Sequence, residues 1–173
     1  MERETILILD FGSQYTQLIA RRIREQGVYC EIRPCNEAPP ATPPAGLKGL
    51  VLSGGPSSVY DDDAPPFDPA WLGVGVPVLG ICYGMQLVAH LLDGKVEHAE
   101  RREYGRAAVE VTEKGLLFAG LESEETVWMS HGDHVTRLPG GFTQTARTSN
   151  AAVVGMEDRG RRIYGIQFHP EVS

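Results

Sequence analysis

The chain has 173 residues, of which 42% are hydrophobic and 23% are charged. This length favours one domain with a sizeable core, and the composition excludes a disordered tail or a disulfide-stabilised miniprotein. The 16 Lys and Arg residues against 23 Asp and Glu residues give a net charge of −7. A net acidic domain does not attract phosphate backbones, so we do not expect nucleic acid as a partner.

The cysteines Cys30, Cys35 and Cys82 lack the spacing of a disulfide framework or a metal site, which favours a reducing, cytoplasmic location. Residues 69–92 carry no formal charge and are long enough to span a bilayer. The stretch also contains Pro77, four glycines and His90, so we interpret it as a buried strand, a turn and a helix. We expect neither a membrane segment nor a signal peptide.

The first half of the chain alternates between β-rich apolar runs and segments with helical periodicity. The pattern predicts strands over 5–10, 28–33, 47–52 and 76–81, and helices over 13–26 and 83–92. Ser13 is expected to cap the first helix, and Gly27 and Gly94 are expected to end the two helices. The five prolines of residues 34–46 indicate a loop. Strands separated by crossovers predict a parallel sheet with helices on both faces.

The second half contains strand-like runs separated by Gly, Pro or Asn, and no predicted helix. These runs cover residues 107–111, 125–129, 142–147, 151–156 and 162–168. No repeat or linker divides the chain, so residues 1–173 are predicted to form a single domain. A doubly wound sheet usually covers its last strand with a helix, and none is predicted before Ser173. We therefore expect the chain to be the N-terminal fragment of a longer protein whose covering helix is missing here.

The strongest chemical signal is the sequence Gly-Ile-Cys-Tyr-Gly at residues 80–84, between a predicted strand and a predicted helix. It has the form of a nucleophile elbow with cysteine in place of serine. Glycines two residues to either side let neighbouring elements approach, and the thiol of Cys82 stands at a helix N-terminus that favours the thiolate. A buried structural cysteine is the alternative, but the strand–elbow–helix context favours a nucleophile.

A thiolate nucleophile requires a base and a group that orients the base. His169 and Glu171 are two residues apart in a segment predicted to be extended, so their side chains point the same way. Pro170 between them stiffens the backbone. The sequence therefore predicts a triad of Cys82, His169 and Glu171.

Residues 53–58, Ser-Gly-Gly-Pro-Ser-Ser, follow the predicted strand 47–52 and are placed where a parallel strand can offer backbone donors to an oxyanion. The segment also resembles a phosphate-binding loop. It contains no lysine and continues into Asp61, Asp62 and Asp63, which would repel phosphate, so nucleotide binding is not expected here.

His131, Asp133 and His134 have the residue types of metal ligands, but Gly132 breaks the regularity and no fourth ligand is nearby in the sequence. We predict no metal site and interpret residues 129–134 as a loop that lines the substrate.

Several motifs together resemble the class I, or triad, glutamine amidotransferases. They are the cysteine elbow, the glycine loop 53–56 and the His-Pro-Glu ending. The segments 8–15 (Ile-Leu-Asp-Phe-Gly-Ser-Gln-Tyr), 82–86, 102–105 and 128–133 (Trp-Met-Ser-His-Gly-Asp) resemble more narrowly the glutaminase domains of GMP synthases. The resemblance runs from about residue 5 to residue 172.

The resemblance implies a Rossmann-like or flavodoxin-like sheet, mostly parallel and flanked by helices, with extra antiparallel strands in the second half. It implies that the triad is catalytic and that the backbone N–H groups of Gly55 and Tyr83 form an oxyanion hole. It further implies a glutamine pocket lined, largely through backbone, by Gly54, Gln86, Ser130, His131, Gly132 and Asp133.

The same resemblance implies that L-glutamine is the substrate and that the released ammonia serves an ATP-pyrophosphatase (synthetase) domain, fused or separate, which converts XMP to GMP. This domain would need no cofactor, whereas ATP and Mg²⁺ would be used by the synthetase domain that this chain lacks. The full-length enzyme is expected to be a homodimer, and the chain alone is not expected to make GMP.

Two other function classes remain open. The chain can be a glutaminase subunit of another pathway, such as anthranilate or carbamoyl phosphate synthesis, although residues 10–15 argue against it. A non-catalytic redox-sensing, chaperone-like or glutamine-sensing domain also fits a cysteine elbow. Such a domain does not require the His-Pro-Glu partner, and an assay of ammonia release distinguishes it from an enzyme.

Overall fold

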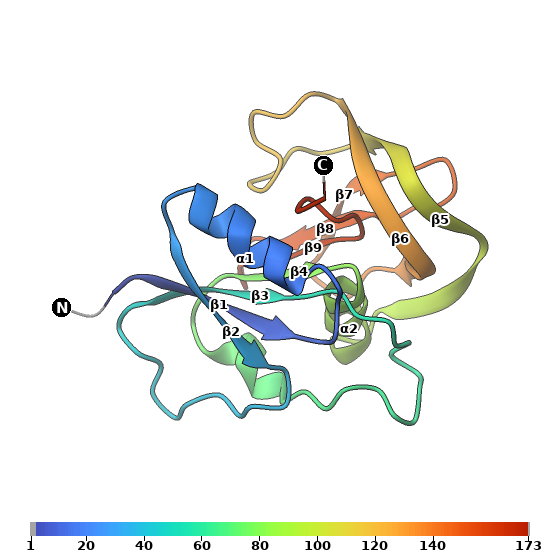
Figure 1. Cartoon of the computed structure of the whole chain (residues 1–173). Helices are drawn as coiled ribbons and strands as arrows, with labels where there is room; N and C mark the ends of the chain where they lie inside the picture. Colours follow the sequence, from blue (N-terminus) through green and yellow to red (C-terminus); the bar gives the residue numbers. More distant parts are fainter. Residues whose placement is uncertain (1–2, 173) are drawn as a thin grey trace.

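The computed structural model describes residues 3–172, which form nine strands, two α-helices and one 3-10 helix (Figure 1). The strands are β1 (Thr5–Asp10), β2 (Tyr29–Pro34), β3 (Leu47–Leu52), β4 (Val78–Ile81), β5 (Lys95–Val111), β6 (Glu124–Arg137), β7 (Thr143–Arg147), β8 (Gly155–Asp158) and β9 (Ile163–Ile166). The helices are α1 (Thr16–Glu25), α2 (Tyr83–Leu91) and the 3-10 helix η1 (Pro69–Gly73).

All nine strands share one sheet, in the order β2-β1-β3-β4-β9-β8-β7-β5-β6. The strands from β2 to β9 in this order pair in parallel, and the strands from β9 to β6 pair antiparallel. The last strand of the chain, β9, therefore joins the two halves by pairing with β4 on one side and β8 on the other. The predicted α/β fold class, with parallel strands in the first half and antiparallel strands in the second, is confirmed, although the sheet is mixed and not mostly parallel.

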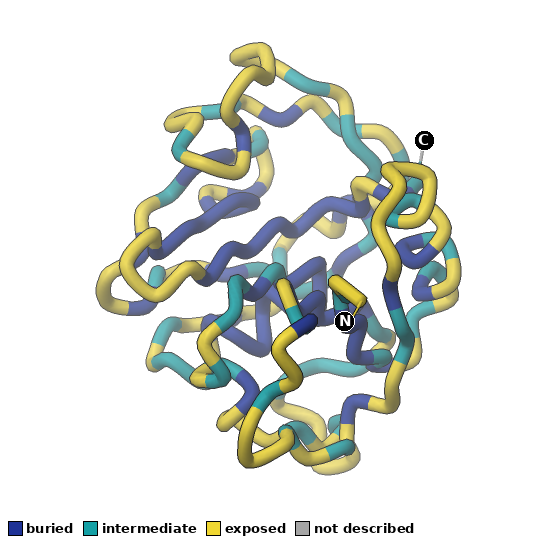
Figure 2. The backbone as a smooth tube through the Cα atoms, turned by 90° about the vertical axis from the view of Figure 1, so that its left-hand side faces the viewer, coloured by how far each residue is buried: buried dark blue, intermediate teal, exposed yellow. Residues whose placement is uncertain are grey.

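Each face of the parallel part of the sheet carries its own apolar core. Alternate residues of a strand point to opposite faces, and Ile8 of β1 packs on the side of Ile19 in α1. Its neighbour Leu9 packs on the other side, with Trp71 of η1 and Met85 of α2. Figure 2 shows the buried strands crossing the middle of the molecule, with exposed loops around them. The prediction of helices on both faces is therefore confirmed.

The start of the first helix differs from the prediction. Helix α1 begins at Thr16, after Tyr15, and no side chain caps it. The hydroxyl of Ser13 accepts a hydrogen bond from the N–H of Tyr15 at 3.0 Å, so it closes a local turn before the helix. At the other end, Gly27 has the predicted left-handed backbone with φ of 76°. Beyond α2 it is Asp93, with φ of 67°, that takes this conformation instead of Gly94.

The two long strands β5 and β6 are the largest departure from the prediction. Strands were expected over residues 107–111 and 125–129 only, and residues 129–134 were expected to form a loop. These residues lie inside β6 instead, where His131 pairs with Glu103 and Ser130 pairs with Tyr104 of β5. Cross-strand hydrogen bonds hold this polar hairpin, whose sequence lacks the alternation that marks a strand with one buried face. The helix η1 was also not predicted.

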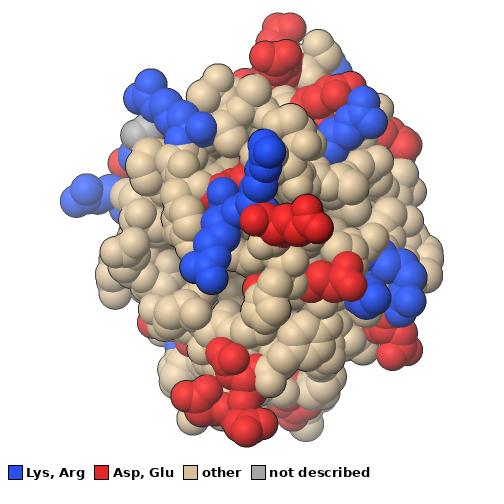
Figure 3. Space-filling view, turned by 90° about the vertical axis from the view of Figure 1, so that its right-hand side faces the viewer, with Lys and Arg blue, Asp and Glu red and all other residues tan. Residues whose placement is uncertain are grey.

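Charged side chains are unevenly distributed on the face seen in Figure 3. Basic side chains lie beside acidic ones across the middle of this face, and acidic side chains gather at its lower end. Among residues 3–172, no helix is long and apolar enough to cross a membrane.

Candidate active site

The turn between β4 and α2 places Cys82 in a conformation that L-residues rarely adopt, with φ of 53° and ψ of −109°. Close packing around the turn requires the two flanking glycines. A β-carbon at Gly80 would lie 2.6 Å from the carbonyl oxygen of Gly84, and one at Gly84 would overlap with the carbonyl oxygen of Leu52. The strand–elbow–helix geometry predicted for residues 80–84 is therefore present.

The sulfur of Cys82 is surrounded by polar atoms although the residue is buried. It lies 3.5 Å from the main-chain oxygen of Ser130 in β6. The side-chain N–H of Gln167, which follows β9, donates a hydrogen bond to it at 3.4 Å. The residue also stands at the N-terminus of α2, where the helix dipole favours negative charge.

His169 and Glu171 lie side by side after β9, as their spacing predicts. The Nδ1 atom of His169 is 2.6 Å from Oε1 of Glu171, and their side chains are only 4% and 2% exposed. The N–H of His169 donates to the main-chain oxygen of Trp128, and Arg22 of α1 donates to the main-chain oxygen of Glu171 at 3.1 Å. The segment is thus fixed from both the second half of the sheet and α1.

The surroundings of His169 favour its protonated form. Burial, the largest single influence, lowers the pKa of the imidazole, but a hydrogen bond with Cys82, the hydrogen bond with Glu171 and the charges of both raise it to about 9. The imidazole therefore lines the same cavity as the cysteine and is hydrogen-bonded to the carboxylate. This geometry suits an imidazolium that shares its charge between a thiolate and a carboxylate.

A cavity of about 250 Å³ opens onto this group of side chains. Its lining residues come from the ends of β1, β3 and β4, from β6 and from the segment after β9: Gly12, Ser13, Gln14, Tyr15, Gly55, Pro56, Cys82, Ser130 and His169. The loops after β1 and β3 are joined where Ser53 Oγ accepts from the N–H of Phe11 at 2.9 Å. The cavity therefore sits at the carboxyl ends of the parallel strands, the usual ligand-binding edge of an open α/β sheet.

The predicted oxyanion-hole residues are both neighbours of Cys82, one through the cavity and one along the chain. Gly55 lines the cavity, and a β-carbon there would lie 2.5 Å from the carbonyl oxygen of Phe11. Tyr83 is the first residue of α2, so its N–H has no acceptor within the helix. Gly54 packs beneath the imidazole, because a β-carbon there would lie 3.0 Å from Cε1 of His169.

Five of the six residues predicted for the glutamine pocket are not among those that line the cavity. Ser130 lines it, whereas the other five do not: Gly54, Gln86, His131, Gly132 and Asp133. The imidazole of His131 contacts Glu103 at 3.0 Å, and the N–H₂ group of Gln86 donates to the main-chain oxygen of Asp133 at 3.0 Å. The strand conformation of β6 explains the placement of His131 and Asp133, since their side chains point to the face opposite that of Ser130.

Sequence reasoning missed several residues of the site. Residues 12–15 and Pro56 line the cavity, and Gln167 contacts the sulfur. The position of residues 12–15 directly after the first predicted parallel strand was the available signal, because ligands bind at such carboxyl ends. No three His, Cys, Asp or Glu side chains within residues 3–172 are grouped so that they could hold a metal ion.

Comparisons with known proteins agree with this geometry. A family model for class I glutamine amidotransferases matches residues 7–173. The glutamine-hydrolysing GMP synthase of Geobacillus kaustophilus is 54% identical over 172 residues, which cover 99% of this chain and 34% of that protein. The chain thus spans about a third of the length of the curated relatives it matches.

Two solved structures share the fold. A protein from Thermoplasma acidophilum, described as one subunit of a GMP synthase, is 35% identical with a TM-score of 0.85, over 100% of this chain and 87% of that one. A glutamine amidotransferase from Thermotoga maritima is 22% identical with a TM-score of 0.80, over 100% and 78% of the two chains, and shows the fold alone. With the matching family model and the sequence identities, these similarities confirm the predicted resemblance: the chain belongs to the class I glutamine amidotransferase family.

Proposed function

We propose that this chain hydrolyses the side-chain amide of L-glutamine and supplies the ammonia for the amination of XMP to GMP. The observation that carries the proposal is that Cys82 and His169 line one cavity, with Nδ1 of His169 hydrogen-bonded to Oε1 of Glu171 at 2.6 Å. The similarity to GMP synthases over nearly the whole chain supports the choice of pathway.

In the first half-reaction the thiolate of Cys82 attacks the side-chain amide carbon of glutamine. The C=O electron pair moves to oxygen, giving a tetrahedral oxyanion beside the N–H groups of Gly55 and Tyr83. Losing one such donor typically costs about 3 kcal/mol of transition-state stabilisation. His169 then gives its proton to the amide nitrogen, the C–N bond breaks, and ammonia leaves a glutamyl thioester on the sulfur.

In the second half-reaction neutral His169 removes a proton from water as the water oxygen attacks the thioester carbon. The C–S bond breaks, glutamate is released, and the thiolate of Cys82 and the imidazolium of His169 are restored. Proton transfer by a positioned imidazole contributes roughly 10²–10⁴-fold. Glu171 orients the ring and stabilises its charged form, as carboxylates do in related triads.

The proposal needs no metal or cofactor in this chain, because the thiolate supplies the nucleophile and backbone donors hold the oxyanion. The ATP and Mg²⁺ of the overall reaction belong to an ATP-pyrophosphatase partner that activates XMP. Whether that partner is fused or separate, ammonia released at Cys82 has to reach it without loss to solvent.

The test is an assay of ammonia release from glutamine with the parent chain and with Cys82→Ala. Both are measured in the presence of a nucleotide-loaded synthetase partner from a relative, since the glutaminases of this family often depend on it. We expect turnover by the parent chain and only the background rate with Cys82→Ala. Equal rates in the two samples would remove Cys82 as the nucleophile, and release of ammonia without formation of GMP would point to another amidotransferase pathway.

A further inference from the structure

A buried side chain outside the triad contacts the reacting sulfur. Gln167 is 0% exposed, and its Nε2 atom lies 3.4 Å from Sγ of Cys82. Its main chain is fixed, because its N–H donates to the carbonyl oxygen of Val154 at 2.9 Å. The primary amide of Gln167, directly after β9, therefore provides the sulfur with an N–H donor.

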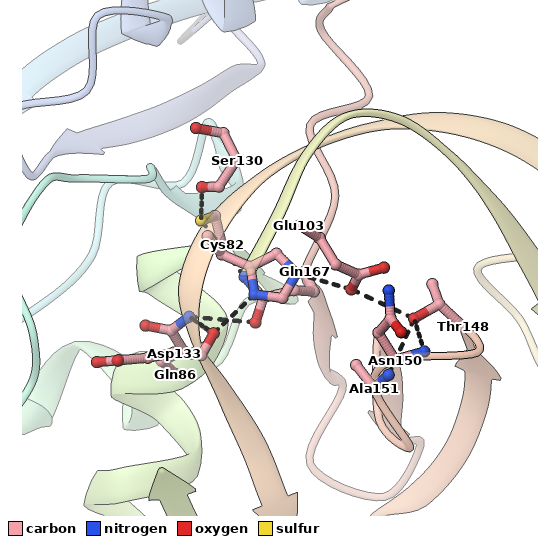
Figure 4. Close-up of polar contacts among 10 residues, drawn as sticks. Cys82, Gln86, Glu103, Ser130, Asp133, Thr148, Asn150, Ala151 and Gln167 are labelled. Carbon is pink, nitrogen blue, oxygen red and sulfur yellow. Dashed lines mark hydrogen bonds and ion pairs between the residues drawn. The ribbon is translucent and has the colours of Figure 1, made fainter. Parts of the chain in front are cut away.

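The orientation of this amide is determined by its neighbours. Nε2 of Gln86 lies 3.0 Å from the main-chain oxygen of Asp133 and 3.1 Å from Oε1 of Gln167 (Figure 4). A main-chain carbonyl oxygen can only accept, so Gln86 must present its N–H₂ group there. That group then donates to the oxygen of Gln167, which leaves the N–H₂ group of Gln167 facing Cys82.

The acceptor that orients Gln86 is itself held by a buried ion pair. Nδ1 of His131 lies 2.8 Å from the main-chain oxygen of Asp133, and its Nε2 lies 3.0 Å from Oε1 of Glu103. The side chains of His131 and Glu103 are 1% and 6% exposed, and the hydroxyl of Thr148 donates to the same carboxylate oxygen at 3.2 Å. A continuous set of hydrogen bonds therefore connects β5, β6 and α2 to the sulfur.

We propose that Gln167 stabilises the thiolate of Cys82 through this N–H···S hydrogen bond, with Gln86 as the positioning residue that fixes the direction of its amide. Only the benefit of this hydrogen bond for glutamine hydrolysis rests on the proposed function; the stabilisation of the thiolate does not. In the second half-reaction the sulfur leaves as a thiolate anion. The amide of Gln167 can donate a hydrogen bond to this anion at any working pH, because the amide does not titrate. Hydrogen bonds to charged groups are about twice as strong as neutral ones.

The titratable side chains around the sulfur are those of His169 and Tyr15, which line the same cavity, and of Glu171 behind His169. The hydrogen bonds of the Gln167 side chain go to Cys82 and Gln86 and not to these groups, so an effect of Gln167 is separable from theirs. The measurement is the rate of Cys82 alkylation by iodoacetamide between pH 5 and pH 10, with the modified cysteine identified by peptide mass mapping. This rate follows the thiolate fraction and requires no turnover of glutamine.

The variants are Gln167→Met, which keeps the length of the side chain but removes the donor, and Gln86→Met, which removes only the group that orients it. Gln17→Met, at an exposed position of α1, is the matched control. We expect the midpoint of the rate profile to move up by about one pH unit in Gln167→Met, the effect of losing one hydrogen bond to a charged atom. We expect a smaller upward move in Gln86→Met and none in Gln17→Met.

An unchanged midpoint in a folded Gln167→Met chain would overturn the proposal. If that variant does not fold, Gln86→Met decides, since a midpoint equal to that of the parent chain would overturn it equally. The ammonia assay separates this inference from the proposed function: normal ammonia release by the parent chain with no shift in the variants refutes the role of Gln167 alone. A shift in the variants without any glutaminase activity of the parent chain refutes the proposed function alone.

Discussion

Packing of glycine against backbone holds Cys82 in its unusual conformation. The turn is compressed between β3 and α2, where Gly84 faces the carbonyl oxygen of Leu52 and Gly80 faces the main chain of Gly84. A side chain at Gly84 would force α2 away from β3, and one at Gly80 would force α2 away from β4. The elbow is therefore a property of three elements together, and the backbone strain at Cys82 is maintained by their packing.

We predict that Gly84→Ala lowers the free energy of unfolding by about 2 kcal/mol or more, because its methyl group overlaps with Leu52. Gly73→Ala is the matched control, since a β-carbon there meets nothing within 4 Å, and it should change stability by less than about 1 kcal/mol. Urea unfolding followed by circular dichroism measures both. Equal stability of the two variants would contradict the close packing at the elbow.

The raised pKa of His169 predicts a pH-dependent contribution to stability. Because the folded-state pKa is about 9 and the ordinary value is 6.5, the contribution is fully present below pH 6.5 and is lost as the pH rises through about 9. We expect the difference in unfolding free energy between the parent chain and Glu171→Gln to be larger at pH 6 than at pH 10. A difference that stays constant over this range would contradict the imidazolium–carboxylate pair.

At the residue scale, short-range spacing predicts some neighbours well. The pair His169 and Glu171 follows from alternation along an extended segment, and the glycines of the elbow follow from its backbone geometry. The contact of Gln167 with Cys82 joins residues 85 positions apart in the chain, so no local pattern identifies it. For Ser13 a local pattern was misleading. Its residue type and position predicted a helix cap, but its hydroxyl accepts from the N–H of Tyr15 in the turn before the helix.

At the scale of elements, β5 and β6 form a long hairpin that carries the buried pair Glu103–His131. The carboxylate of Glu103 faces the imidazole at 3.0 Å in a region almost closed to water. Burial raises the pKa of Glu103, but the hydrogen bonds with His131 and Thr148 and the nearby imidazoles lower it overall, so the carboxylate is ionised. The pair therefore ties the two strands together beside the active site.

We predict that Glu103→Ala lowers the free energy of unfolding by about 3 kcal/mol, because it leaves His131 buried without its partner. Glu110→Ala in the same strand is the control. Glu110 pairs with Arg147 at 2.9 Å, but both side chains are more than half exposed, so its loss should cost less than about 1 kcal/mol. Thermal or urea unfolding of the two variants tests this, and similar losses in both would contradict a structural role for the buried pair.

The same hairpin shows where prediction of elements from sequence fails. The parallel strands are predicted within a few residues, because burial on both faces leaves a continuous apolar run such as Ile6–Leu9. Residues 97–103 of β5 are mostly exposed and charged, so their strand conformation depends on cross-strand hydrogen bonds instead of an apolar face. Its pattern therefore resembles that of a loop.

At the scale of the whole molecule, the halves of the chain are joined by one sheet and by two apolar cores that both halves share. Strand β9 pairs with β4, and the core that contains Trp71 also contains Val135 and Phe142 from the second half. The sequence predicts the four parallel strands of the first half, but neither the strand order nor the parallel pairing of β9 as a fifth. The insertion of β9 between β4 and β8 is set by contacts between distant segments.

We predict that both halves unfold in a single transition. The two tryptophans provide separate probes, since Trp71 lies in the core beneath the parallel strands and Trp128 lies in β6. The variant Trp128→Phe leaves Trp71 as the fluorescent probe, and Trp71→Phe leaves Trp128. In each variant the urea midpoint from tryptophan fluorescence should equal the midpoint from circular dichroism. Two separated transitions in one variant would contradict a single domain.

The central claim, that Cys82 is the nucleophile toward glutamine, is tested most directly by covalent labelling with a glutamine-like electrophile, such as a chloroketone analogue of glutamine. We predict one adduct, on Cys82, that excess glutamine prevents and that is absent from Cys82→Ala. Peptide mass mapping locates the modified residue. An adduct on Cys30 or Cys35 with Cys82 unmodified, or labelling that glutamine does not slow, would contradict the claim.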